Sequence, residues 1–190
     1  MNLVSYALVT LDDTKSFLGY TNNSKDETTK LFINMATDFI EEYCNRRFKM
    51  TTYTDDKYDG TGEKNLLLKN YPVDTLTAIA ENTQSDGNGS WVILDSDNYN
   101  VEVKTGIIEK KCSFNRGFQN YQIDYKAGFD DIPYDIQFAC MSFVENLFRQ
   151  RNAQGLESES LGDHRVVFLK AFQENDQYKK VLDKYKNINV

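Results

Sequence analysis

The residues that could carry chemistry in this sequence are few, and each has a simpler explanation. His164 is the only histidine, which excludes metal sites built from several imidazoles and leaves one residue for a Ser or Cys triad. It stands beside Asp163 in a polar stretch, where a surface histidine without a catalytic role is the favoured interpretation. The segment Gly60–Asn65 has the wrong glycine spacing for a phosphate loop, and neither Ser nor Thr follows Lys64.

Carboxylates gather at three places without the pattern of a cation site or a catalytic pair. Asp55 to Gly60 begins like a calcium loop, but Lys57 occupies a ligand position and Leu66 stands where a bidentate glutamate is required. Close carboxylate pairs in turns mostly cap or terminate structure. The remaining pairs of this kind are Asp95 with Asp97 and Asp130 with Asp131. The sequence therefore predicts no catalytic residue, no metal site and no cofactor, and we do not expect an enzyme.

Length, charge and apolar content limit the number of domains and the kinds of partner that this protein can have. The 190 residues are enough for one domain, or one domain with a small appendage. The net charge of −7 argues against a protein that binds nucleic acid by neutralising phosphates. The tight basic cluster Arg46, Arg47 and Lys49 is interpreted as the solvated end of a helix. The apolar runs are too short to cross a membrane, and the start of the chain lacks the pattern of a signal peptide, so we expect no membrane partner.

Two long amphipathic helices are the elements that organise the chain. The first is predicted over about residues 25–46, with an apolar stripe from Leu31 to Cys44 and a capping box made by Ser24 and Glu27. The second is predicted over about 133–152, because Pro133 suits a first turn and apolar residues then recur at three and four. We expect the two to pack side by side. The cysteines are Cys44, Cys112 and Cys140, of which the first and last lie on these stripes, and all three are predicted to be reduced.

Two shorter helices complete the helical prediction. One spans about residues 10–19, capped by Thr10 and ended by Gly19. The other spans about 175–186, where an apolar stripe either docks on a partner or packs back on its own domain. The stripe consists of Tyr178, Val181, Leu182 and Tyr185.

Between the two long helices, over about residues 49–127, the pattern alternates as in strands. Lys49–Lys57 and Asn65–Lys69 flank the glycine turn YDGTGE and are predicted to form a hairpin. After Pro72, an edge strand is predicted over Val73–Ala80. Four further strands are expected, at Trp91–Leu94, Tyr99–Val103, Gly106–Lys110 and Phe118–Lys126. The fold class is therefore α+β: a small bundle of helices, two of them long and packed antiparallel, with an antiparallel β-sheet inserted between the second and third helices.

In combination these segments resemble the head-to-tail connector (adaptor) proteins of tailed bacteriophages and prophages. The opening LVTLDDTKSFLGY looks like the first helix of that family, and ATDFIEEYCNRRF looks like its second. YDGTGEKNLLLKNYPVDTLTAI is similar to its glycine-turn hairpin, and YKAGFDDIPYDIQFACMSFV to the passage into its third helix. SESLGDHRV and LDKYK resemble its later loop and tail. The match extends over nearly the whole chain, 1–190, as a single connector domain.

The resemblance implies a structural role in the virion, after assembly in the host cytoplasm. Copies would form a ring matching the symmetry of the portal protein, join the filled head to a head-closure or tail protein, and let DNA pass only as cargo. It also implies two contact surfaces: the C-terminal stripe Tyr178, Val181, Leu182 and Tyr185 for the portal, and the sheet loop Asp86, Gly87, Asn88 and Gly89 for the neighbouring component. Two alternatives stay open: a head-closure or tail-completion protein of the same virion, and a small intracellular ligand-binding domain.

Overall fold

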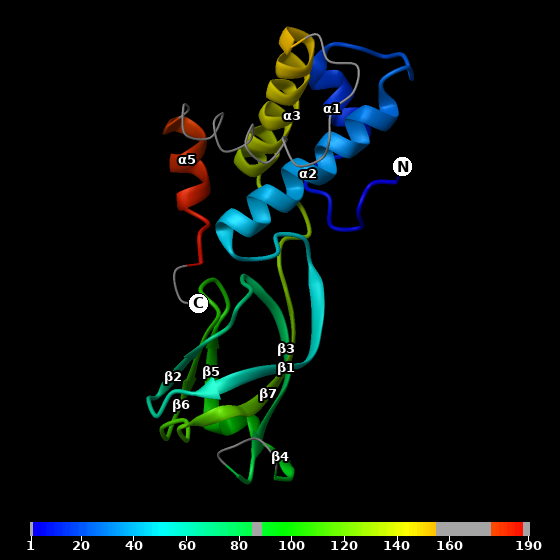
Figure 1. Ribbon diagram of the computed structural model, residues 1–190. Coiled ribbons are helices and arrows are strands. Elements are labelled where there is room, and N and C mark those ends of the chain that lie inside the picture. The colour runs from blue at the N-terminus through cyan, green and yellow to red at the C-terminus, as the bar shows by residue number, and fades with distance from the viewer. Residues whose placement is uncertain (1, 85–88, 155–175, 188–190) are drawn as a thin grey trace. The chain divides into compact units, whose positions relative to one another are not determined.

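The computed structural model describes residues 2–84, 89–154 and 176–187, which divide into two compact units. The helical unit comes from both ends of the chain, within Met1–Phe48 and Asp131–Ile188. The sheet unit lies within Lys49–Asp130 (Figure 1). This confirms the α+β prediction with a β insertion between the second and third helices. None of the helices in the described part of the chain is long and apolar enough to cross a bilayer.

The first helix, α1 (Leu11–Leu18), begins and ends as its sequence predicts. The Thr10 hydroxyl oxygen accepts a hydrogen bond from the Asp13 backbone N–H at 3.1 Å. Gly19 follows with φ of 74°, a left-handed conformation that glycine adopts at low cost.

The second helix, α2 (Asp26–Cys44), is present, but its predicted capping box is wrong. Its N-cap position is Lys25, which makes no side-chain capping bond. The Ser24 hydroxyl instead donates to Asn22 Oδ1 at 2.6 Å, and Glu27 pairs with Lys30 at 2.9 Å. The side chain of Asn22 therefore competes successfully with the helix terminus for Ser24.

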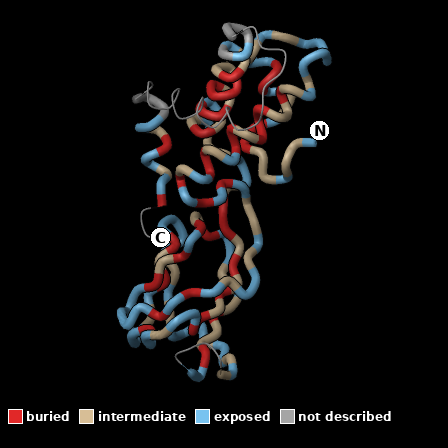
Figure 2. The backbone as a smooth tube through the Cα atoms, viewed as in Figure 1, coloured by how far each residue is buried: buried red, intermediate tan, exposed pale blue. Residues whose placement is uncertain are grey.

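The third helix, α3 (Tyr134–Gln154), packs antiparallel to α2, as predicted. The rings of Phe32 and Phe148 lie 4.9 Å apart, and those of Phe39 and Phe143 lie 5.5 Å apart. The later residue of α2, Phe39, therefore contacts the earlier residue of α3, Phe143, so the two helices run in opposite directions. Figure 2 shows the buried residues gathered along these helices. The buried apolar residues of this core are Phe32, Ile33, Ala36, Ile40, Ile136, Ala139, Cys140, Phe143, Val144 and Leu147.

The sheet unit contains two antiparallel sheets. One has four strands in the order β1 (Thr51–Gly60), β7 (Gly117–Ala127), β3 (Val73–Asn82) and β4 (Trp91–Ile93). The other has three strands in the order β2 (Asn65–Leu67), β6 (Ile107–Lys110) and β5 (Tyr99–Glu102), with a single 3₁₀ turn, η1 (Ser96–Asn98), before β5.

The predicted hairpin of Lys49–Lys57 with Asn65–Lys69 is wrong, because the two strands belong to different sheets. β1 pairs with β7, and β2 pairs with β6. Gly60 is required for close approach rather than for a tight reversal. A Cβ at this position would lie 1.8 Å from the Asn115 carbonyl oxygen. The Gly60 N–H donates a hydrogen bond to Asn120 Oδ1 at 2.7 Å.

The prediction that Val73–Ala80 is an edge strand is wrong only at the end of that range. β3 pairs with β7 from Val73 to Glu81, whereas the three-residue β4 pairs with β3 only at Ala80, Glu81 and Asn82. Pro72 precedes the strand, where its missing N–H removes no bond from the ladder.

Candidate assembly surface

The described residues contain no group of three or more His, Cys, Asp or Glu side chains able to hold a metal ion. Asp55 to Gly60, which begins like a calcium loop, lies in β1. His164 lies outside the described residues. Cys44 and Cys140 are free and buried, and burial raises the pKa of both thiols to about 12. Cys112 is free and exposed.

The C-terminal stripe is partly used inside its own unit. Leu182 in α5 (Asp176–Asp183) is fully buried, and its carbonyl oxygen lies 3.6 Å from Cys44 Sγ. The Tyr185 hydroxyl donates to the Asp135 carboxylate at 2.9 Å, and its ring lies 5.8 Å from that of Phe48. Burial, and then Asp135, raise the pKa of Tyr185 to about 12.

Of the four predicted contact residues at this end, Val181 is half-buried and Leu182 belongs to the core of the unit. The side chain of Tyr178 lies outside the described residues. Packing on the chain's own helices is thus the observed arrangement for Leu182 and Tyr185.

Of the sheet-loop residues, Asp86, Gly87 and Asn88 lie outside the described residues. Gly89 is described, and its conformation follows from contacts with Asn82. The Asn82 side chain accepts from the Gly89 N–H at 2.8 Å and donates to its carbonyl at 3.0 Å. A Cβ on Gly89 would lie 2.3 Å from Thr83 Oγ1.

In the basic cluster at the end of α2, Arg47 and Lys49 are exposed, as expected for a solvated helix end, but Arg46 is not. Arg46 is buried, with its guanidinium 5.2 Å from the ring centroid of Phe48. Arg47 pairs with the buried Glu41, which also accepts from the Phe48 N–H at 3.1 Å. Desolvation raises the pKa of Glu41, although these two partners oppose the shift. The cluster therefore secures the chain as it leaves α2.

A hollow of about 210 Å³, which no pattern in the sequence predicts, opens on the helical unit. We call it the α1–α3 hollow. It is formed by the end of α1, the connection to α2 and the last part of α3. Its lining residues are Phe17, Leu18, Tyr20, Lys25, Glu145, Phe148 and Arg149.

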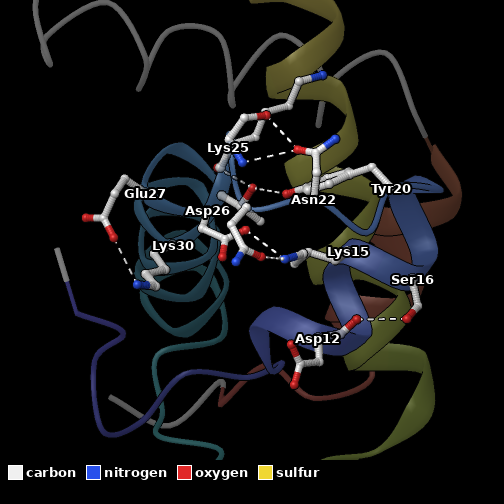
Figure 3. Close-up of polar contacts among 12 residues, drawn as sticks. Asp12, Lys15, Ser16, Tyr20, Asn22, Lys25, Asp26, Glu27 and Lys30 are labelled. Carbon is white, nitrogen blue, oxygen red and sulfur yellow. Dashed lines mark hydrogen bonds and ion pairs between the residues drawn. The ribbon is translucent and has the colours of Figure 1, made fainter.

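Polar contacts hold the connection that forms one wall of the α1–α3 hollow (Figure 3). Lys15, on the buried side of α1, reaches Asp26 and Asn23, each at 2.9 Å. The Tyr20 hydroxyl shares a hydrogen bond with Thr29 Oγ1 of α2. Because these bonds tie α1 and the connection to α2, the aromatic ring of Tyr20 is held in position.

The hollow combines aromatic walls with cations at its rim. The Lys25 ammonium lies 5.8 Å from the ring centroid of Tyr20 and 5.9 Å from that of Phe148. Arg149 pairs with Glu145 at 2.6 Å, one turn earlier on α3. Its side chain remains 73% exposed. Two cations and one carboxylate therefore stand beside the aromatic side chains of the hollow.

Three aromatic side chains are exposed on the outer side of α1 and α3. Tyr134 is 88% exposed, Phe138 is 54% exposed and Phe17 is 38% exposed. The rings of Phe17 and Phe138 meet edge to face at 5.9 Å. Tyr134 and Phe138 fall outside the apolar stripe that α3 buries, so the sequence carried a signal for this surface. Exposed apolar residues in the sheet unit are Val92, Ile93, Val103 and Phe118.

The family model "Head completion protein" matches residues 7–188, which span both units. The chain belongs to this family. As a head completion protein it is a structural protein of the virion, acting where the head is joined to the tail. The search of curated proteins found no match.

Solved structures of gene transfer agent particles have a similar fold. The neck of an empty particle, computed with C6 symmetry, matches with a TM-score of 0.57 and 14% identity, covering 100% of this chain and 95% of that chain. The virion of a native particle matches with a TM-score of 0.57 and 13% identity, covering 100% of this chain and 95% of that chain. The neck of a native particle, computed with C12 symmetry, matches with a TM-score of 0.56 and 14% identity, covering 100% of this chain and 94% of that chain. At 13–14% sequence identity these matches show that the folds are similar, and nothing more.

Proposed function

We propose that copies of this protein form a ring beneath the portal vertex, which joins the DNA-filled head to the next component of the neck or tail. The observation that carries the proposal is the family match over residues 7–188, which includes both the helical and the sheet unit. The gene transfer agent necks of similar fold were computed with C6 and C12 symmetry, which favours a cyclic arrangement here as well.

The charge of the chain supports a role in which DNA passes without being held. The net charge of −7 repels phosphates, and retention on a protein surface requires clustered Lys and Arg. In this role the protein needs no catalytic step. Its exposed aromatic side chains serve contacts with other protein subunits instead.

The portal protein is the proposed partner at one side of the ring. Val181 and Tyr178 remain our candidates for that contact, because Leu182 and Tyr185 are occupied within their own unit. The loop with Asp86, Gly87, Asn88 and Gly89 is the candidate contact for the head-closure or tail protein.

The test is to mix the purified protein with the purified portal assembly and image the complex by electron microscopy. The expected result is a closed ring of this protein with a fixed number of copies per portal. An unrelated acidic protein of similar size serves as the control for non-specific adhesion.

A different outcome would redirect the assignment. Stoichiometric binding to an already capped head, without binding to the bare portal, would favour a head-closure or tail-completion role. Saturable binding of a metabolite in the α1–α3 hollow, with no binding to virion proteins, would contradict the structural proposal.

A further inference from the structure

Two chemically complementary surfaces lie at opposite ends of α3. The first is the α1–α3 hollow, with aromatic walls and the cations Lys25 and Arg149 at its rim. The second is an acidic and aromatic projection at the start of α3, which we call the α3 knob. The α3 knob consists of Asp131 and Tyr134. Phe138, one turn further along α3, is not part of it, because its ring already packs on Phe17 of the hollow at 5.9 Å.

The α3 knob has no partner that accounts for its composition. Tyr134 exposes 88% of its surface, and no hydrogen bond or ion pair found among the described residues involves it. Asp131 is exposed and likewise has no such contact within the described ranges. An aromatic ring beside an exposed carboxylate is the kind of side-chain pair that a pocket with aromatic walls and a cationic rim binds.

The size of the α1–α3 hollow fits this occupant. A cavity of about 150 Å³ admits a benzene ring. The hollow of about 210 Å³ is therefore large enough for the ring of one tyrosine. Lys25 and Arg149 at its rim are then placed to meet a carboxylate close to that tyrosine.

Tyr134 does not reach the Phe148 wall of the α1–α3 hollow in its own molecule, where it remains 88% exposed. Tyr134 and Phe148 both belong to α3 (Tyr134–Gln154). The rise of a helix separates them by about 21 Å along its axis. A contact between them must therefore join two copies, and because it uses different patches on the two partners, it repeats from copy to copy and closes into a ring when the rotation permits.

We propose that the α3 knob of one copy binds in the α1–α3 hollow of the next copy, and that this contact is the lateral joint of the ring. The inference rests on the proposed ring function and adds the surfaces that join its subunits. The charge of the chain supports a second copy as the occupant. Each copy carries a net charge of −7, and copies of that charge repel one another unless cations and carboxylates meet at their joint.

Zero-length cross-linking tests the joint with the native residues. A carbodiimide couples a carboxylate to an amine only when the two groups are in contact. The assembled complex with the portal is expected to yield a linked peptide pair joining Asp131 to Lys25, whereas the unassembled protein is expected to yield none. Complete rings that lack this linked pair, while other carboxylate–lysine pairs are recovered between copies, would overturn the proposal.

A charge exchange tests the same contact by function. Asp131→Lys and Lys25→Glu should each weaken copy-to-copy association about tenfold or more. The double variant Asp131→Lys/Lys25→Glu should recover most of that loss because both signs are exchanged. Lys184→Glu makes the same charge change as Lys25→Glu, but at an exposed position outside both surfaces, and should leave copy-to-copy association unchanged.

Two readouts separate this inference from the proposed function. Binding of single copies to the portal reports the function, and completion of the ring reports the lateral joint. If the double variant forms rings no better than the single variants, the proposed joint is wrong even where portal binding is intact. If the wild-type protein never binds the portal, the ring function fails and this inference fails with it.

Discussion

Both faces of α3 carry large apolar or aromatic side chains, but those on the inner face are buried and those on the outer face are exposed to solvent. On the inner face Ile136 and Phe143 are fully buried against the rest of the helical unit. On the outer face Tyr134 and Phe138 remain 88% and 54% exposed. Apolar burial stabilises a fold, whereas a cluster of exposed aromatic residues costs solubility and is typical of a contact surface. The inner side of α3 therefore serves folding, and the outer side carries the exposed residues that the proposed lateral joint uses.

The largest effect is expected on the inner face. Phe143→Ala removes a buried ring that contacts Phe39, which leaves a cavity between α2 and α3. We expect a loss of about 3–5 kcal/mol in the free energy of unfolding. Urea unfolding followed by the helical circular dichroism signal measures it. A loss below 1 kcal/mol would mean that this face is not the core of the unit.

An intermediate effect is expected from Phe138→Ala. This side chain is half-exposed, and its ring meets Phe17 edge to face at 5.9 Å. The expected loss is about 1–2 kcal/mol, from the ring pair and its partial burial. The same unfolding experiment applies, and a loss as large as that of Phe143→Ala would remove the distinction between the two faces.

Tyr185→Phe tests the contact of the C-terminal segment with the start of α3. It deletes the hydroxyl that donates to Asp135, and we expect a loss of about 1 kcal/mol at neutral pH. Burial and the Asp135 carboxylate raise the pKa of Tyr185 from the ordinary 10.0 to about 12, so the unfolded chain loses this proton first. Stability from this group is complete below pH 10 and falls between pH 10 and pH 12.

The comparison of wild type with Tyr185→Phe across that range isolates the contribution of the hydroxyl. The difference in stability between the two proteins should shrink as pH rises from 10 to 12. A difference that stays constant over this range would show that Tyr185 titrates alike in the folded and unfolded chains.

The smallest effect on stability is expected from Tyr134→Ser. The side chain is almost fully exposed, so unfolding should change by no more than about 0.5 kcal/mol. Ring formation on the portal should nevertheless fall. A variant that unfolds much more easily would place Tyr134 among the folding residues and contradict its proposed role in the lateral joint.

The elements that were predictable from sequence depend on local signals. Thr10 and Gly19 delimit α1 because a cap and a left-handed terminus involve only neighbouring residues. The capping box at Ser24 failed because Asn22, also a neighbour, offers the hydroxyl a competing acceptor. Each predicted strand overlaps a strand of the structure, although several bounds differ. The alternating pattern carries no information about which strands pair, and it does not show that Gly60 lies against the Asn115 carbonyl.

The assembly surface was predictable only in part. Tyr134 and Phe138 lie off the buried stripe of α3, so their exposure follows from helical periodicity alone. The α1–α3 hollow did not follow, because Tyr20 and Phe148 come together only through the tertiary packing of distant segments. The position of Lys15, buried and paired with Asp26, also depends on that packing.

The most direct test of the central claim is the number and arrangement of copies in a reconstituted complex with the portal, determined by electron microscopy without imposed symmetry. One closed ring per portal is expected, in which the start of α3 of each copy contacts the end of α3 of the next. A complex of isolated copies bound around the portal with no contact between them, or no complex at all, would contradict it.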